Sequence, residues 1–249
     1  MWFCGMLSFE KRDWLQQYMV AQTVISPPNA AFAFPLTANS RHLTSELWES
    51  FRYLHHSLDE TLDNFPASCL LLGQPGSGKS FAIKAHVGRS AAKYLHQLEN
   101  DPELAQLAHV PIFVDLKQYA GSLKELFPHQ ITPARLKKLT KSGRASFLLD
   151  SYNEVPRQHV ESGRLQDDVL DWMDSTLGCR WIIASRGAEG LEQFEFPHIL
   201  VGELREDYLA EVLTDSRIDL GQRHAQDLFT ILRRPIFLAA LLTKRMQLN

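Results

Sequence analysis

The segment from Gly73 to Ser80, GQPGSGKS, has the residue types and the spacing of a phosphate-binding loop. Its glycines allow the backbone to curl so that successive N–H groups face an anion. Lys79 can reach the β- and γ-phosphates, and the Ser80 hydroxyl can hold Mg²⁺. An apolar run, Cys69 to Leu72, precedes the loop, and the helical pattern after it adds the positive end of a helix dipole. The candidate nucleotide-binding residues here are Gly73, Gln74, Pro75, Gly76, Ser77, Gly78, Lys79, Ser80 and Phe81.

Two acidic residues follow a buried apolar run further along the chain. The run from Ser146 to Leu149 is followed directly by Asp150, and Glu154 comes four residues later. A carboxylate at the end of such a strand can bind Mg²⁺, and a second one on the next loop can orient and deprotonate an attacking water. We therefore assign Ser80 and Asp150 to the metal and Glu154 to catalysis. The alternatives are a turn or helix-cap aspartate and a solvated surface glutamate.

An arginine follows the next apolar run, Trp181 to Ala184. The planar guanidinium of Arg186 could bind phosphate oxygens and lose them on hydrolysis, so it could sense the γ-phosphate. A surface arginine in a turn is the alternative. The candidate catalytic residues are Glu154, Lys79 and Arg186.

The order of the elements predicts an α/β fold. Short apolar runs that read as strands cover residues 69–72, 110–114, 146–149, 181–184 and 197–202, and amphipathic helical patterns separate them. Alternation of this kind predicts a doubly wound parallel sheet flanked by helices. Ligands bind at the carboxyl ends of the strands in such sheets, which is where the loop, the two acids and the arginine fall.

Composition narrows the class of protein. The chain has 249 residues, 45% of them hydrophobic, and a net charge of −3 with Lys and Arg scattered, which argues against nucleic acid as the main partner. Three widely spaced cysteines favour a reducing compartment. We find no signal peptide and no apolar stretch of the ~18 residues that a membrane span needs. The expected location is the cytoplasm.

Three regions can be distinguished along the chain. Residues 1–39 form an extension of unknown role, in which a short helix over 11–22 leads into a connector over 23–39 rich in Pro, Ala and Asn. Residues 40–202 form the nucleotide-binding domain, beginning with a helix over 45–58. Residues 203–249 form a small helical subdomain whose last helix opens at Pro235. These helices could cover the nucleotide as a lid or simply cap the edge of the sheet.

Five motifs together resemble a known family. GQPGSGKS, VPIFVDL, SFLLDSYNEVP, WIIASR and LRRPIFLAALL occur in the order seen in the NACHT-type domain of the STAND class of P-loop NTPases, bacterial members most of all, over about residues 68–242. The resemblance implies that Asp150 coordinates Mg²⁺, that Glu154 supports hydrolysis, that Arg186 is the sensor and that Pro235 lies against the adenine. It also implies ATP binding, slow hydrolysis, and ADP/ATP exchange that converts a closed monomer into an oligomer.

The chain departs from that pattern in three ways. Ser151 stands where glycine is common, and Asn153 replaces an aspartate found in many members. The sequence also stops at Asn249, soon after the apolar segment from Ile236 to Leu242, with no winged helix, repeat array or effector domain. Because that segment is apolar around its whole circumference, we expect further protein, either sensor or effector domains or partner proteins, to cover it.

Other functions remain open from the sequence. A nucleotide-gated signalling switch is the leading hypothesis, with bacterial defence as its candidate setting. A P-loop kinase that phosphorylates a small acceptor and a nucleotide-binding module without turnover are the alternatives. An ABC-type ATPase is disfavoured because no Leu-Ser-Gly-Gly signature occurs.

Overall fold

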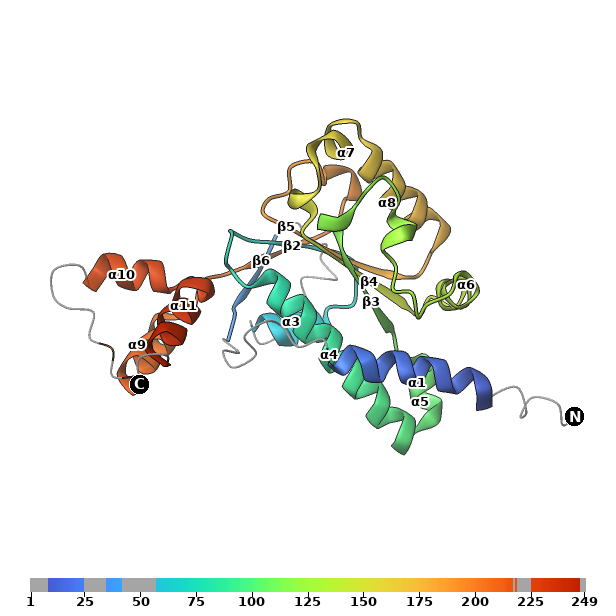
Figure 1. Cartoon of the computed structure of the whole chain (residues 1–249), viewed down its shortest axis with the longest axis horizontal. Helices are drawn as coiled ribbons and strands as arrows, with labels where there is room; N and C mark the ends of the chain where they lie inside the picture. Colours follow the sequence, from blue (N-terminus) through green and yellow to red (C-terminus); the bar gives the residue numbers. More distant parts are fainter. Residues whose placement is uncertain (1–8, 25–34, 42–56, 217, 219–224, 247–249) are drawn as a thin grey trace, which may run out of the picture.

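A six-stranded sheet forms the centre of the computed structural model, which describes residues 9–24, 35–41, 57–216, 218 and 225–246 (Figure 1). The strand order is β1-β6-β2-β5-β4-β3. Five strands run parallel, and β1 pairs antiparallel with β6 at one edge. The strands are β1 (Ala38–Arg41), β2 (Cys69–Leu72), β3 (Val110–Asp115), β4 (Ala145–Asp150), β5 (Arg180–Ser185) and β6 (His198–Val201). The five runs predicted as strands are therefore confirmed as β2 to β6.

Helices cover both faces of the sheet. Side chains alternate along each strand, so Cys69 and Leu71 of β2 pack into one core cluster and Leu70 and Leu72 into another. Helices α3 (Leu58–Asn64) and α4 (Lys79–Asn100) line the first cluster, and α6 (Pro133–Lys141) and α8 (Arg164–Ser175) line the second. Shorter helices, α5 (Pro102–Leu107) and α7 (Arg157–Glu161), complete the layers. The α/β prediction is confirmed, because the parallel sheet lies between helical layers.

The helix predicted over residues 11–22 is confirmed as α1 (Phe9–Thr23). Helix α1 packs on α4, and the Tyr18 hydroxyl donates a hydrogen bond to the carbonyl of Pro111, 2.7 Å away. The connector predicted over 23–39 was wrong at its last two residues, because β1 begins at Ala38. β1 also continues past residue 39, where the nucleotide-binding domain was expected to begin. β1 has the sequence ANSR, with no apolar alternation, and pairing with the distant β6 makes it a strand. Of the helix predicted over 45–58, residues 45–56 lie outside the described residues.

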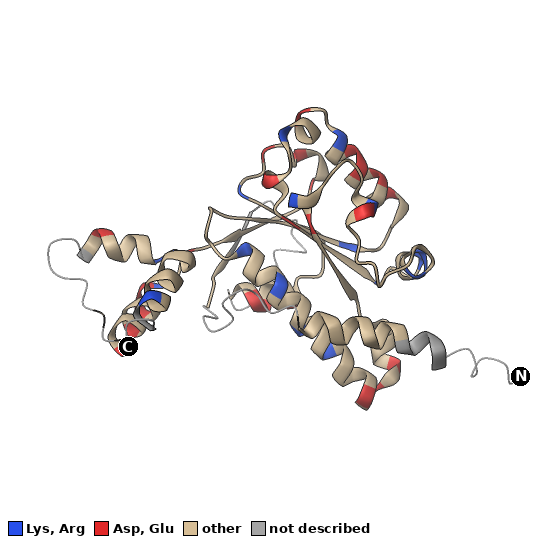
Figure 2. Cartoon of the chain, viewed as in Figure 1, with Lys and Arg blue, Asp and Glu red and all other residues tan. Residues whose placement is uncertain are grey.

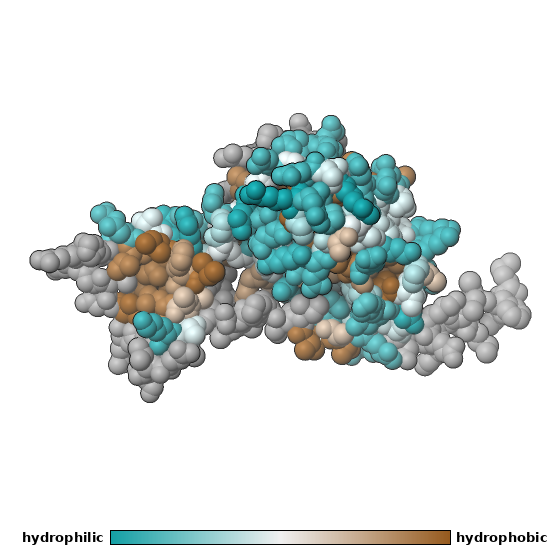
Figure 3. All heavy atoms as spheres, turned by 45° about the horizontal axis from the view of Figure 1, so that its top comes forward, coloured by the Kyte–Doolittle hydropathy of each residue, from teal (hydrophilic) through white to brown (hydrophobic). Residues whose placement is uncertain are grey.

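Three helices stand beside the sheet and are called the C-terminal helices here: α9 (Glu206–Asp215), α10 (Ala225–Leu232) and α11 (Pro235–Met246) (Figure 1). Pro235 opens α11 as expected. Figure 3 shows hydrophobic residues gathered over this group. The exposed apolar side chains there are Leu228, Ile231, Ile236 and Phe237. Helices long and apolar enough to cross a bilayer do not occur in the described ranges.

Candidate functional site

The loop between β2 and α4 is shaped by two glycines. Gly76 and Gly78 have φ angles of 77° and 94°, a region that residues with a Cβ rarely adopt. A Cβ on Gly76 would lie 2.4 Å from Cγ2 of Ile236, and one on Gly78 would lie 2.8 Å from Cδ1 of Leu36. The loop therefore needs glycine both for its own conformation and for its neighbours, one from the N-terminal region and one from α11.

Lys79 is folded over the loop. Its Nζ donates to the carbonyls of Gly73, at 2.5 Å, and Gln74, at 3.2 Å. Burial lowers the pKa of this lysine, and the carboxylate of Asp150 partly offsets the effect. Ser77 is buried, and its Oγ has no hydrogen-bond partner among the described residues. A lysine cation held over a glycine loop fits a phosphate group.

Asp150 ends β4 within the same site. It is 5% exposed and accepts a hydrogen bond from Ser80, the residue after the loop lysine. Burial raises the pKa of Asp150, and Asp115, its register partner on β3, raises it further. No group of three or more His, Cys, Asp or Glu side chains that could hold a metal by itself occurs among the described residues. One carboxylate and one hydroxyl fit Mg²⁺, which usually keeps several waters and completes its shell with substrate phosphates.

Glu154 is held by two cations. It lies in the short helix η3 (Tyr152–Glu154), where Nζ of Lys117 is 3.1 Å from one carboxylate oxygen and Nη2 of Arg186 is 3.8 Å from the other. The pKa of Lys117 is raised by its hydrogen bond to Glu154. The backbone N–H of Arg186 donates to Oδ1 of Asn153, 3.0 Å away, so that side chain positions the arginine. Sequence reasoning missed Lys117, although it follows the carboxyl end of β3, where a ligand-facing residue is expected.

Ser151 adopts a left-handed conformation, with φ of 65°. It is 6% exposed and lies between Asp150 and the η3 helix. L-residues other than glycine pay about 1–2 kcal/mol in this region. Backbone geometry thus accounts for the sequence expectation that glycine would suit this position.

These residues meet around a cavity of about 720 Å³, called the loop cavity here. This volume lies within the ~300–1,000 Å³ typical of small-molecule sites. The predicted residues that line it are Pro75, Gly76, Gly78, Lys79, Ser80, Phe81, Asp150, Glu154, Arg186 and Pro235. Gly73, Gln74 and Ser77 belong to the loop but do not line the cavity. Leu36, and Ile236 and Lys244 of α11, also line it and were not predicted.

Comparison with known proteins adds little to this geometry. No protein-family model and no curated protein matches the sequence. Among solved structures, that of C. elegans PCH-2 matches with a TM-score of 0.37 and 13% sequence identity, over 82% of this chain and 46% of the other. The chain thus spans less than half the length of that protein, and a TM-score this low does not establish a shared fold.

Proposed function

We propose that this chain is a P-loop NTPase that binds Mg²⁺-ATP in the loop cavity and hydrolyses it slowly, as a nucleotide-gated switch of the NACHT type in the STAND class. One observation carries the proposal. The glycine loop, the carboxylate that ends β4, Arg186 and the first residue of α11 all line a single cavity. A ligand in this cavity would therefore contact the glycine loop, Arg186 and helix α11, which would respond to it.

Each residue has a distinct role in this proposal. The loop amides and Lys79 hold the β- and γ-phosphates. Ser80 and Asp150 hold Mg²⁺, which neutralises phosphate charge. Pro235 contacts the base. Glu154 positions the attacking water, and its contacts with two cations hold the carboxylate away from that water, which supports slow turnover.

Arg186 connects the nucleotide state to the catalytic acid. It is exposed, its backbone is fixed by Asn153, and its guanidinium lies 3.8 Å from Glu154. A γ-phosphate would compete with Glu154 for this guanidinium, because phosphate oxygens bind arginine strongly. We propose that ATP draws Arg186 away from Glu154 and that ADP returns it.

The C-terminal helices are the proposed responders. Exchange of ADP for ATP would move α11 and expose a surface for self-association, or for the sensor and effector proteins that a switch requires. Exposed apolar side chains on α10 and α11 support such contacts. A cytoplasmic setting suits this chemistry, since ATP is the proposed ligand.

Calorimetric titration of Mg²⁺-ATP into the Lys79→Ala variant tests the proposal. We expect affinity to fall at least about a hundredfold, because the lysine is the chain's main phosphate cation. Lys138→Ala is the matched control, since this lysine is exposed on α6 and does not line the loop cavity. Unchanged affinity in the Lys79 variant would refute nucleotide binding at this loop.

Product analysis separates the switch from the other two functions. The switch predicts release of free phosphate from ATP and a larger assembly with ATP than with ADP in analytical ultracentrifugation. A phosphorylated small acceptor would identify a kinase instead. Binding with no phosphate release, unaffected by Glu154→Gln, would identify a module without turnover.

A further inference from the structure

A second cavity lies at the opposite end of the parallel strands from the loop cavity. It has a volume of about 490 Å³ and is called the basic cavity here. Ser146 and Arg180, near the beginning of β4 and β5, line it, and these two residues are register partners on neighbouring strands. Basic residues occur along the length of α4 (Figure 2), and Arg89 and Lys93 of that helix face this cavity. It shares no lining residue with the loop cavity.

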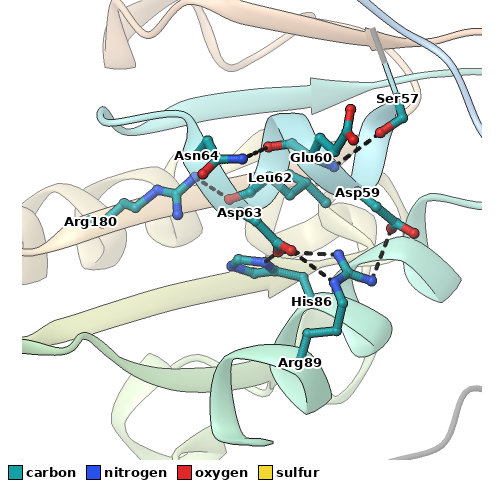
Figure 4. Close-up of polar contacts among 9 residues, drawn as sticks. All are labelled: Ser57, Asp59, Glu60, Leu62, Asp63, Asn64, His86, Arg89 and Arg180. Carbon is teal, nitrogen blue, oxygen red and sulfur yellow. Dashed lines mark hydrogen bonds and ion pairs between the residues drawn. The ribbon is translucent and has the colours of Figure 1, made fainter. Parts of the chain in front are cut away.

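Arg180 is a partly buried cation without a carboxylate partner among the described residues. Its Nη2 donates to the carbonyl of Leu62, 2.9 Å away (Figure 4). Its Nε donates to the carbonyl of Ala67, 3.3 Å away. Neither contact carries a negative charge. Burial lowers the pKa of Arg180, and the charge of Asp63 offsets this only in part. Removing an ion from water without a counter-charge is costly, so the site favours an anion beside the guanidinium.

Two further polar atoms in the basic cavity are unused. Ser146 is 3% exposed, and its Oγ has no hydrogen-bond partner in the described structure. Oε1 of Gln97, on α4, is also buried and without a partner there. Buried polar atoms are nearly always paired, and an unpaired one indicates a missing partner. The hydroxyl can donate to an anion, and the amide oxygen can accept from a hydroxyl.

The one carboxylate that lines the cavity is already engaged. Asp63 accepts from Nδ1 of His86, at 2.6 Å, and from Nε of Arg89, at 3.0 Å (Figure 4). Burial alone would raise the pKa of Asp63, but these hydrogen bonds lower it overall. Arg89 is also 3.1 Å from Asp59. Asp63 therefore pairs directly with Arg89 and acts on Arg180 only at longer range, whereas Arg180 and Lys93 form no ion pair among the described residues.

We propose that the basic cavity binds a phosphate ester of a small molecule that carries hydroxyl groups. The phosphate contacts Arg180, Lys93 and the Ser146 hydroxyl, and a ligand hydroxyl donates to Gln97. Leu104 and Leu107 of α5 line the cavity and are exposed, so they provide an apolar contact for the carbon skeleton. The site is independent of the proposed function, because it uses none of the residues of the loop cavity.

Burial lowers the pKa of His86 and of His109, which also lines the cavity, and the charge of Arg180 lowers both further. A bound phosphate would offset the charge of Arg180. The pKa values of the two histidines should therefore rise on binding, which NMR of the imidazole protons can follow.

The test uses the full chain carrying Lys79→Ala, so that the loop cavity does not contribute and failure of the proposed function does not affect the result. Ribose 5-phosphate, AMP, inorganic phosphate and ribose are titrated separately by calorimetry. We expect the two esters to bind, ribose not to bind, and inorganic phosphate to bind at least about tenfold more weakly than the better ester. The two esters distinguish a sugar phosphate from a nucleotide.

Three substitutions identify the site. Ser146→Ala removes only the unpartnered hydroxyl and should weaken ester binding about three- to tenfold. Lys93→Met removes one phosphate contact and should weaken binding by a similar factor. It leaves the buried hydrogen bonds around Asp63 intact, so the fold should not change. Arg180→Met should abolish binding, with circular dichroism confirming its fold. Lys138→Met is the control and should change nothing. Absence of ester binding, equal binding of inorganic phosphate, or full affinity in both Ser146→Ala and Lys93→Met would overturn the proposal.

Discussion

The backbone N–H of Ile236 donates a hydrogen bond to the carbonyl of Gly76, 3.4 Å away, and thereby joins α11 to the glycine loop between β2 and α4. The Ile236 side chain lies over the space that a Cβ of Gly76 would fill. A change in the loop on ligand binding must therefore move either the backbone of α11 or this side chain. Substitutions at four positions, Gly76, Asp150, Lys117 and Ser151, test how the site depends on its contacts.

Gly76→Ala should weaken Mg²⁺-ATP binding at least about tenfold, because the left-handed backbone and Ile236 both oppose a Cβ. Adding Ile236→Ala should restore part of the loss, since it removes the closest atom but not the backbone strain. Calorimetry of the single and double variants gives the coupling free energy between positions 76 and 236. Adding Phe237→Ala instead, an exposed neighbour outside the loop cavity, should restore nothing. Equal restoration by both would disprove a specific contact.

Asp150→Asn should stabilise the nucleotide-free protein by about 1 kcal/mol while abolishing the Mg²⁺ dependence of ATP binding. The carboxylate is buried beside Asp115, and removal of its charge relieves both desolvation and repulsion. Urea unfolding without Mg²⁺ measures the first effect, and titration with and without Mg²⁺ measures the second. Asp174→Asn, exposed on α8, should change neither. A less stable Asp150 variant would contradict the electrostatic argument.

Lys117→Met should raise the rate of ATP hydrolysis about two- to fivefold, because loss of the 3.1 Å ion pair frees the Glu154 carboxylate to contact the attacking water. Phosphate release under single-turnover conditions is the measurement. The gain should disappear when Glu154→Gln is added, and Lys124→Met, an exposed lysine of the helix η2 (Leu123–Leu126), should leave the rate unchanged. A slower Lys117 variant would show instead that this lysine assists the reaction.

Ser151→Gly should raise the free energy of unfolding by up to about 1 kcal/mol, because glycine adopts the left-handed conformation without a Cβ clash. Ser151→Val should lower it by about 2 kcal/mol, since a β-branched side chain tolerates that region poorly. Glu195→Gly provides a comparison at the other described non-glycine residue with positive φ, 50°, outside the loop cavity. Chemical denaturation of the three variants checks the order, and a stabilising valine would refute the strain.

The sheet could be predicted largely because its central strands are continuous apolar runs. β2 and β4 are buried along their whole length, and the polar residues after them mark the carboxyl ends. Strand β1 could not be predicted, because its four residues carry no such pattern and its partner lies about 160 residues away in the register Ala38 with Val201. Pairing across that separation is a property of the tertiary structure.

The composition of the loop cavity was also largely predictable, but its internal contacts were not. Spacing along the chain indicates that Asp150, Glu154 and Arg186 follow strands, and parallel strands bring such residues to one edge. It does not indicate that Glu154 forms ion pairs with both Arg186 and Lys117. Nor does it indicate that Lys79 donates a hydrogen bond to a carbonyl of its own loop. Those contacts depend on the length of the side chains and on competition among charges, which a sequence pattern does not predict.

The two side chains that press on the loop glycines, Leu36 and Ile236, are both aliphatic. Contact between carbon atoms is insensitive to ionic strength, whereas the ion pairs of the half-exposed Glu154 weaken as salt screens them. The proposed sensing of the γ-phosphate through Arg186 and the proposed transmission through α11 should therefore respond differently to concentrated salt. The first would fade, while the second would persist as long as the volume of these two side chains is kept.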